Sequence, residues 1–99
     1  MYLYNVTLIA ENDIGEAVYR YLMTQLADGA HGTDNRPALL EMLDSPHDGR
    51  TYCIQLRTDS RADITTFQQT RLTTIRTHLD AVHAGKVLVF DSVMKYLNP

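Results

Sequence analysis

The sequence lacks most features that would assign it to a specialised class of protein. It has a single cysteine, Cys53, so no disulfide can form within the chain, which agrees with a reducing compartment. Its uninterrupted apolar runs are only a few residues long, far below the roughly 20 residues needed to span a bilayer. A basic N-terminal region followed by an apolar signal core is also missing. We therefore expect a cytoplasmic protein with no membrane partner.

A strong charge of either sign is missing as well. The chain has 12 acidic and 9 basic residues, a formal net charge of −3, which gives no broad positive field for a phosphate backbone. Nucleic acid is therefore not expected as a partner. With 99 residues, 44% of them apolar and 21% charged, the composition is that of one ordinary globular domain over residues 1–99.

The order of predicted elements indicates the fold class. Alternation of apolar side chains predicts a first strand over Tyr2–Ala10, with Tyr4, Val6, Leu8 and Ala10 on the face toward the core. The other predicted elements are a helix whose core stripe runs from Ile14 to Leu26, strands at Ala38–Leu43 and Thr51–Thr58, a long helix whose stripe runs from Ile64 to Val82, and a strand at Lys86–Tyr96. This β-α-β-β-α-β order is typical of α+β ferredoxin-like domains, with two helices on one face of a four-stranded antiparallel sheet.

Local signals mark where these elements begin and end. Asn12 or Asp13 is expected to cap the first helix, and Thr58-Asp59-Ser60 supplies caps for the second. The longest predicted loop is Asp28–Pro37, which contains two glycines and a proline. The segment Ser45–Gly49 is a strong turn signal, and Gly85 is well placed to end the second helix.

In this fold one face of the sheet is left bare, and its predicted residues are mixed in character. The first strand places Leu3, Asn5, Thr7 and Ile9 there, and the third strand places Cys53, Gln55 and Arg57. A mixed face is typical of partial burial, so a homodimer formed through the open sheet face is predicted. The candidate binding residues are Asn5, Thr7, Gln55 and Arg57, which would bind each other, water or a small organic ligand.

Motifs that carry catalytic or metal chemistry are not found. His78 and His83 are five residues apart on one helix, about 140° around its axis, so they cannot offer one ion two ligands and are expected to face solvent. There is no phosphate-binding loop, nucleophile elbow or Cys-x-x-Cys pair. Cys53 is expected to be a small buried side chain. Neither a metal nor a cofactor is predicted, and an enzymatic role stays open.

Three segments nevertheless resemble a known family: Tyr4-Asn5-Val6-Thr7, Thr51-Tyr52-Cys53-Ile54-Gln55 and Phe90-Asp91-Ser92-Val93-Met94. They are similar to a small bacterial family of unknown function, with chains of about this length, a Tyr-Asn-Val-Thr first strand and a Tyr-x-x-Gln third strand. Such proteins resemble the dimeric α/β-barrel group, in which ferredoxin-like protomers pair through their open sheet faces. Family-like sequences often have a Trp-rich first helix ending in His-Ile-Pro, but this chain has Tyr19–Leu26 there.

The leading hypothesis is a homodimeric module that binds a small molecule or another protein. The alternative, implied by the resemblance, is a cofactor-independent monooxygenase-like or isomerase-like enzyme whose substrate would be positioned by the same four residues and by Tyr52 or His31. A third hypothesis is an amino-acid-binding regulatory domain. RNA binding is not favoured, because Tyr4 and Tyr52 have the parity of the helix-covered face and not of the open one.

Overall fold

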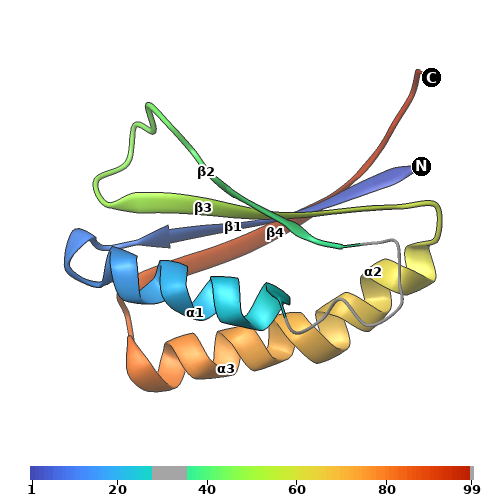
Figure 1. Cartoon of the computed structure of the whole chain (residues 1–99). Coiled ribbons are helices and arrows are strands. Elements are labelled where there is room, and N and C mark those ends of the chain that lie inside the picture. Colours follow the sequence, from blue (N-terminus) through green and yellow to red (C-terminus); the bar gives the residue numbers. More distant parts are fainter. Residues whose placement is uncertain (28–35, 99) are drawn as a thin grey trace.

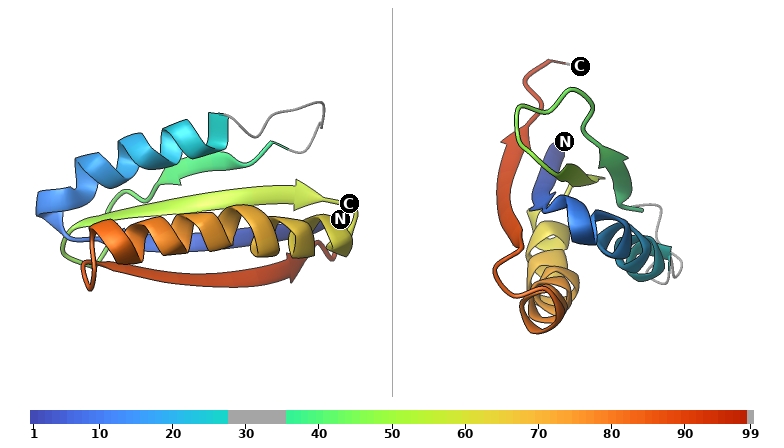
Figure 2. Two further views of the ribbon diagram at one scale, coloured as in Figure 1. Left: turned by 90° about the horizontal axis from the view of Figure 1, so that it is seen from below. Right: turned by 90° about the vertical axis from the view of Figure 1, so that its left-hand side faces the viewer.

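The computed structural model describes residues 1–27 and 36–98, and these have the element order expected from the sequence (Figure 1). The strands are β1 (Tyr2–Ala10), β2 (Ala38–Glu41), β3 (Arg50–Thr58) and β4 (Val87–Lys95). The helices are α1 (Gly15–Ala27), α2 (Arg61–Phe67) and α3 (Thr73–Val82). The strands form one antiparallel sheet in the order β2-β3-β1-β4, with all three helices on the same face (Figure 2). The predicted ferredoxin-like fold is confirmed.

The core lies between the helices and the sheet face formed by the even-numbered residues of β1 and β3. Successive side chains of a strand point to opposite faces, so Tyr4, Val6 and Leu8 all face the helices, and each is buried. The residues that close this core from the helices are Val18, Leu22, Ile64, Phe67, Leu72, Ile75 and Leu79. Val82, predicted on the same stripe, is exposed because α3 ends there and the chain turns at His83 toward β4.

The start of the first helix differs from the expectation. Asn12 and Asp13 do not cap it but lie in a short 3₁₀ turn, Asn12–Ile14, which precedes α1. Asp13 instead binds Lys86 Nζ at 2.6 Å, which holds this turn to the start of β4. The hydrogen bond from Lys86 keeps the pKa of Asp13 below its usual value.

The second helix begins as predicted but is not continuous. Ser60 caps α2, since its Oγ accepts a hydrogen bond from the backbone N–H of Ala62 at 3.2 Å. Between α2 and α3 the segment Gln68–Leu72 forms a π-helical turn, which the 3.6-residue pattern did not predict. Such turns insert one extra residue and recur at functional sites.

The loops are described in part. Strand β2 ends at Glu41, two residues earlier than predicted, and residues 28–35 of the predicted loop Asp28–Pro37 lie outside the described residues. Gly85 has φ of 76°, which suits the turn that follows α3. In the part of the chain that the structure describes, no helix is long and apolar enough to cross a membrane.

The second face of the sheet, called here the open face, has no helix over it in the described part of the chain. The β2–β3 connection and the segment after β4 rise on this side of the sheet at opposite ends (Figure 1). Beneath the connection Thr51 is buried, and its Oγ1 lies 3.3 Å from Ser45 Oγ. The middle of the open face is therefore left uncovered in the described part of the chain (Figure 1).

Candidate functional site

The open face is arranged in rows, because residues paired across antiparallel strands point to the same side of the sheet. Asn5 of β1 pairs with Gln55 of β3 and with Ser92 of β4, and these three residues form one row, named here the polar row. On one side of it Thr7 pairs with Cys53 and Phe90, and on the other side Leu3 pairs with Arg57 and Met94. A polar strip thus crosses three strands between two rows that contain large apolar side chains.

Hydrogen bonds connect three of the four predicted site residues. Gln55 Nε2 donates to Asn5 Oδ1 at 3.2 Å, and Asn5 Nδ2 donates to Thr7 Oγ1 at 2.9 Å. The hydroxyl of Thr7 also lies 3.9 Å from the sulfur of Cys53, which is buried as predicted. A primary amide carries two N–H donors and a carbonyl with two acceptor positions, so Asn5 and Gln55 retain bonding capacity beyond this network.

Arg57, the fourth predicted residue, lies apart from this network at one end of the open face. Its guanidinium carbon is 5.4 Å from the centre of the Tyr96 ring, which follows β4. Because Leu3 is paired with Arg57 on one side and Met94 on the other, the arginine extends over β1 to reach Tyr96. The structure thus places the arginine over an aromatic ring beside the polar row.

Sequence reasoning missed Ser92 and Tyr96. Both alternating sets of the last strand contain several apolar residues, so the pattern did not reveal which set faces away from the helices. The register resolves this, because Ser92 pairs with Asn5, whose side is already fixed by its buried neighbours Tyr4 and Val6. In the described part of the chain the Ser92 hydroxyl has no hydrogen-bond partner.

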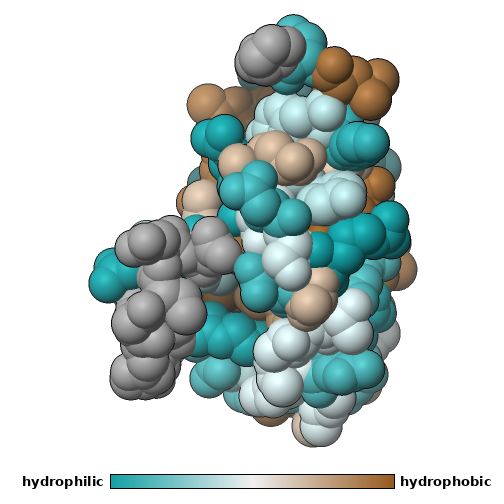
Figure 3. Space-filling model, turned by 90° about the vertical axis from the view of Figure 1, so that its right-hand side faces the viewer, coloured by the Kyte–Doolittle hydropathy of each residue, from teal (hydrophilic) through white to brown (hydrophobic). Residues whose placement is uncertain are grey.

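Large apolar side chains around the polar row are exposed. On the strands these are Leu40, Leu88, Phe90 and Met94, and next to the strands they are Met42, Leu43, Tyr96 and Leu97. Phe90, next to Thr7 near the middle of the face, is 50% exposed. Viewed from the end of the sheet where both termini lie, brown hydrophobic surface gathers toward the upper part of the molecule, the side of the open face (Figure 3).

A second polar cluster lies on the other side of the sheet. The buried Tyr4 hydroxyl donates a hydrogen bond to a carboxylate oxygen of Asp91, next to the π-helical turn that contains Gln68. Burial of the phenol and the hydrogen bond to Asp91 raise the pKa of Tyr4, and nearby Gln68 and Arg76 partly offset this. This cluster was not predicted, since Tyr4 and Asp91 are 87 residues apart and neither belongs to a recognisable motif.

Tyr4→Phe tests this cluster through the pH dependence of stability. At neutral pH the variant is expected to lose about 1.5–3 kcal/mol of unfolding free energy, the usual value of a hydrogen bond to a charged group. Because folding raises the pKa of Tyr4, the unfolded chain loses this proton first, and the stability contribution of Tyr4 falls as pH rises above about 10. Urea denaturation at several pH values should therefore show that the difference in unfolding free energy between wild type and variant becomes smaller at alkaline pH. A difference in stability that did not change with pH would contradict the raised pKa of Tyr4.

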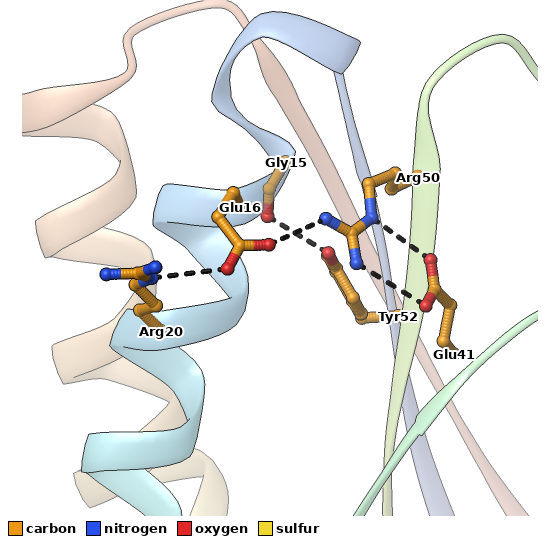
Figure 4. Close-up of polar contacts among 6 residues, drawn as sticks. All are labelled: Gly15, Glu16, Arg20, Glu41, Arg50 and Tyr52. Atoms are coloured by element: carbon orange, nitrogen blue, oxygen red, sulfur yellow. Dashed lines mark hydrogen bonds and ion pairs between the residues drawn. The ribbon is translucent and has the colours of Figure 1, made fainter.

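A third cluster joins α1 to β2 and β3 and is shown in Figure 4. Arg50 donates to both carboxylate oxygens of Glu41, at 3.1 and 3.4 Å, and to Glu16 at 3.1 Å. Arg20 binds the other oxygen of Glu16 at 3.2 Å, and Arg50 lowers the pKa of Glu16 through its hydrogen bond. These charged groups bind one another, so the cluster connects elements and offers little to a ligand.

Two other side chains named from the sequence have different roles from those expected. Tyr52, considered as a substrate-positioning residue, is buried on the helix-covered face, where its hydroxyl donates to the carbonyl of Gly15 at 3.0 Å. His78, expected to be solvated, stacks on Tyr21 with ring centres 3.6 Å apart. His31 lies outside the described residues. Within residues 1–27 and 36–98 no three His, Cys, Asp or Glu side chains gather as a metal site requires.

Comparison with known proteins places this fold among the ferredoxin-like structures of antibiotic biosynthesis monooxygenases. A candidate monooxygenase of this kind from Nitrosomonas europaea is 17% identical, with 99% of this chain and 100% of that chain covered and a TM-score of 0.75. A candidate from Deinococcus radiodurans is 13% identical, with 100% and 95% covered and a TM-score of 0.78. SnoaB, a cofactor-independent oxygenase from Streptomyces nogalater, is 12% identical, with 99% and 94% covered and a TM-score of 0.60.

The TM-scores show a shared fold, and at these low identities they show the fold alone. The model of a domain of unknown function, DUF4286, matches residues 1–97, so the chain belongs to the DUF4286 family. No curated protein matches the chain.

Proposed function

We propose that this protein is a homodimer formed through its open face, and that Asn5, Thr7, Gln55 and Arg57 bind a small organic molecule between the two copies. The observation that carries the proposal is the composition of this face. Exposed apolar side chains surround the polar row, in which Gln55 donates to Asn5, and the strands contribute one charged side chain, Arg57. Depletion of charge at the centre with aromatic and Met side chains around it is typical of protein interfaces.

A second copy of the chain fits this face better than an unrelated partner. In a two-fold interface the same patch meets itself, which suits a face whose middle is an uncharged polar row between apolar side chains. The polar row supplies amide and hydroxyl groups, which both donate and accept hydrogen bonds and can therefore pair with their own copies. The resemblance to dimeric α/β-barrel proteins, which pair through this face, supports the same arrangement.

Sedimentation equilibrium tests the assembly directly. At micromolar concentrations the expected mass is twice the 11.2 kDa of the chain, with dissociation only on strong dilution. Burial of the apolar side chains should also make the melting temperature depend on protein concentration, because association stabilises only the folded chain. A single-chain mass at the highest soluble concentration would refute the proposed dimer.

A cofactor-independent oxygenase or isomerase is a second candidate, and the Tyr4–Asp91 pair favours it. A buried phenol that donates to a carboxylate can hold or transfer a proton, which is the task of a general acid or base. This pair lies on the helix-covered face and is separate from the polar row. Consumption of dissolved oxygen on addition of a small organic compound would distinguish an oxygenase from a binding module.

A further inference from the structure

Arg57 is the one formal charge that the four strands place on the open face. The other side chains that the register assigns to this face are Leu3, Asn5, Thr7, Ile9, Ala38, Leu40, Thr51, Cys53, Gln55, Leu88, Phe90, Ser92 and Met94. In the described part of the chain no carboxylate forms an ion pair with Arg57. Asp59, two residues further along, lies 3.6 Å from the amino group of Met1.

The charge of Arg57 becomes energetically unfavourable when the open face is covered. A guanidinium that leaves water without a negative partner costs several kcal/mol, so buried charges in proteins are paired. The Tyr96 ring orients Arg57 and contributes about 0.5–1 kcal/mol as a cation–π contact, but it carries no negative charge. A second copy brings another Arg57, and its strands bring no carboxylate to this face. The strands of the two copies therefore supply no anion for this charge.

The surroundings of Arg57 suit one kind of anion. Gln55 is two residues away on the same strand face, about 7 Å along the strand, and continues into the polar row with Asn5 and Ser92. A guanidinium binds a carboxylate through two parallel hydrogen bonds, and amide or hydroxyl donors can complete its shell. Leu3, Met94 and Phe90 lie in the rows on either side, where an apolar body would pack.

We propose that the open face binds a small carboxylate with an apolar body, enclosed by the second copy, with Arg57 as the residue that recognises the carboxylate. This inference rests on the proposed dimer, because in a monomer Arg57 would remain in water and need no anion. It deepens that proposal by naming the class of ligand, and it adds Ser92 to the four residues predicted from the sequence.

Isothermal titration of the full-length protein tests the ligand class. The probes are benzoate, phenylacetate and hexanoate, and the neutral comparisons are benzamide and phenylacetamide. Saturable binding of at least one carboxylate is expected, with its amide counterpart at least tenfold weaker, because charge-assisted hydrogen bonds are about twice as strong as neutral ones. Inorganic sulfate should bind at least tenfold more weakly than the best carboxylate, and equal binding would refute the apolar part of the site.

Two arginine variants locate the site. Arg57→Gln should weaken carboxylate binding at least tenfold and still sediment as a dimer. Arg61→Gln is the matched control, since Arg61 also lies over a tyrosine ring, 5.8 Å from the centre of Tyr2, but at the start of α2. It should bind carboxylates as the wild type does. Equal losses in both variants would overturn the assignment of Arg57.

The remaining outcomes separate the two proposals. A wild-type dimer that binds none of the carboxylates would overturn this inference and leave the dimer standing. A wild-type monomer would overturn the proposed function as well. If Asp59→Asn weakened the dimer and the double variant Arg57→Gln/Asp59→Asn restored it, the charge of Arg57 would be neutralised by the protein itself, and the ligand would not be needed.

Discussion

Replacing Phe90 with glutamate is expected to convert the protein to a monomer while leaving the chain folded. Phe90 is half exposed on the edge strand β4 and pairs with Thr7 beside the polar row, so a charge there costs little in a single chain. In a two-fold interface the substitution occurs twice, and each copy would bury a carboxylate among apolar side chains. At several kcal/mol for each buried charge, we expect the dissociation constant to rise by roughly a thousandfold or more. Sedimentation velocity over a range of protein concentrations measures this dissociation constant.

Met23→Glu is the matched control for this prediction. Met23 lies on α1 with 47% of its surface exposed, against 50% for Phe90, but it is on the helical side of the molecule. The same charge change there should leave the dimer intact. Circular dichroism of both variants checks that the fold is retained. If both variants dissociated, or if neither did, the open face would not be the dimer interface.

The sheet could be predicted from the sequence because its two faces differ sharply in β1. Tyr4, Val6 and Leu8 alternate with Asn5 and Thr7, and a one-residue shift would bury the polar set, so the pattern defines both the core and the open face. The same alternation on β3 predicted that Gln55 and Arg57 lie on the open face. Three of the four candidate residues, Asn5, Thr7 and Gln55, are joined by hydrogen bonds.

The parts that could not be predicted depend on contacts between distant segments. Only the register of β4 with β1 shows that Ser92 and Tyr96 lie on the open face. The Tyr4–Asp91 hydrogen bond likewise depends on the pairing of the first and last strands. The π-helical turn has an ordinary helical composition, so its extra residue reflects packing and not propensity. Asp13 lies inside a 3₁₀ turn that the pattern did not predict, and its carboxylate binds Lys86, 73 residues away.

The two faces of β1 therefore have different roles in the molecule, one in stability and the other as the candidate site. The helix-covered face is almost completely buried and stabilises the chain, whereas the open face places polar groups in an apolar surround and leaves a charge unpaired. Residues of the first kind are explained by packing alone. Those of the second kind are solvated in a single chain and become costly only if the face is covered without pairing them, which is why the open face, and not the saturated Arg50 cluster, is the better candidate site.

Gly49→Ala is expected to cause the largest loss of stability among the glycine-to-alanine changes at Gly15, Gly49 and Gly85, the glycines that the structure describes. Gly49 has φ of 94°, a backbone conformation that strains any residue with a Cβ, and an added Cβ would lie 2.2 Å from the carbonyl oxygen of Ala10. That oxygen belongs to the backbone at the end of β1, where Ala10 pairs with Arg50, so relief requires the hairpin to move away from the sheet. We expect a loss of roughly 3 kcal/mol or more, a drop in melting temperature of about 15 °C for a domain of this size.

Gly85→Ala separates the two causes of this loss. Gly85 also has a positive φ, 76°, but an added Cβ there would meet nothing within 4 Å. Gly85→Ala should therefore lose only the stability that corresponds to backbone strain at positive φ, about 1 kcal/mol. Urea denaturation of both variants gives the difference, which measures the contact between Gly49 and the end of β1. Equal losses of stability in the two variants would mean that the hairpin can move away from Ala10 without cost. In that case the contact between Gly49 and Ala10 would not hold the start of β3, the strand that carries Cys53, Gln55 and Arg57.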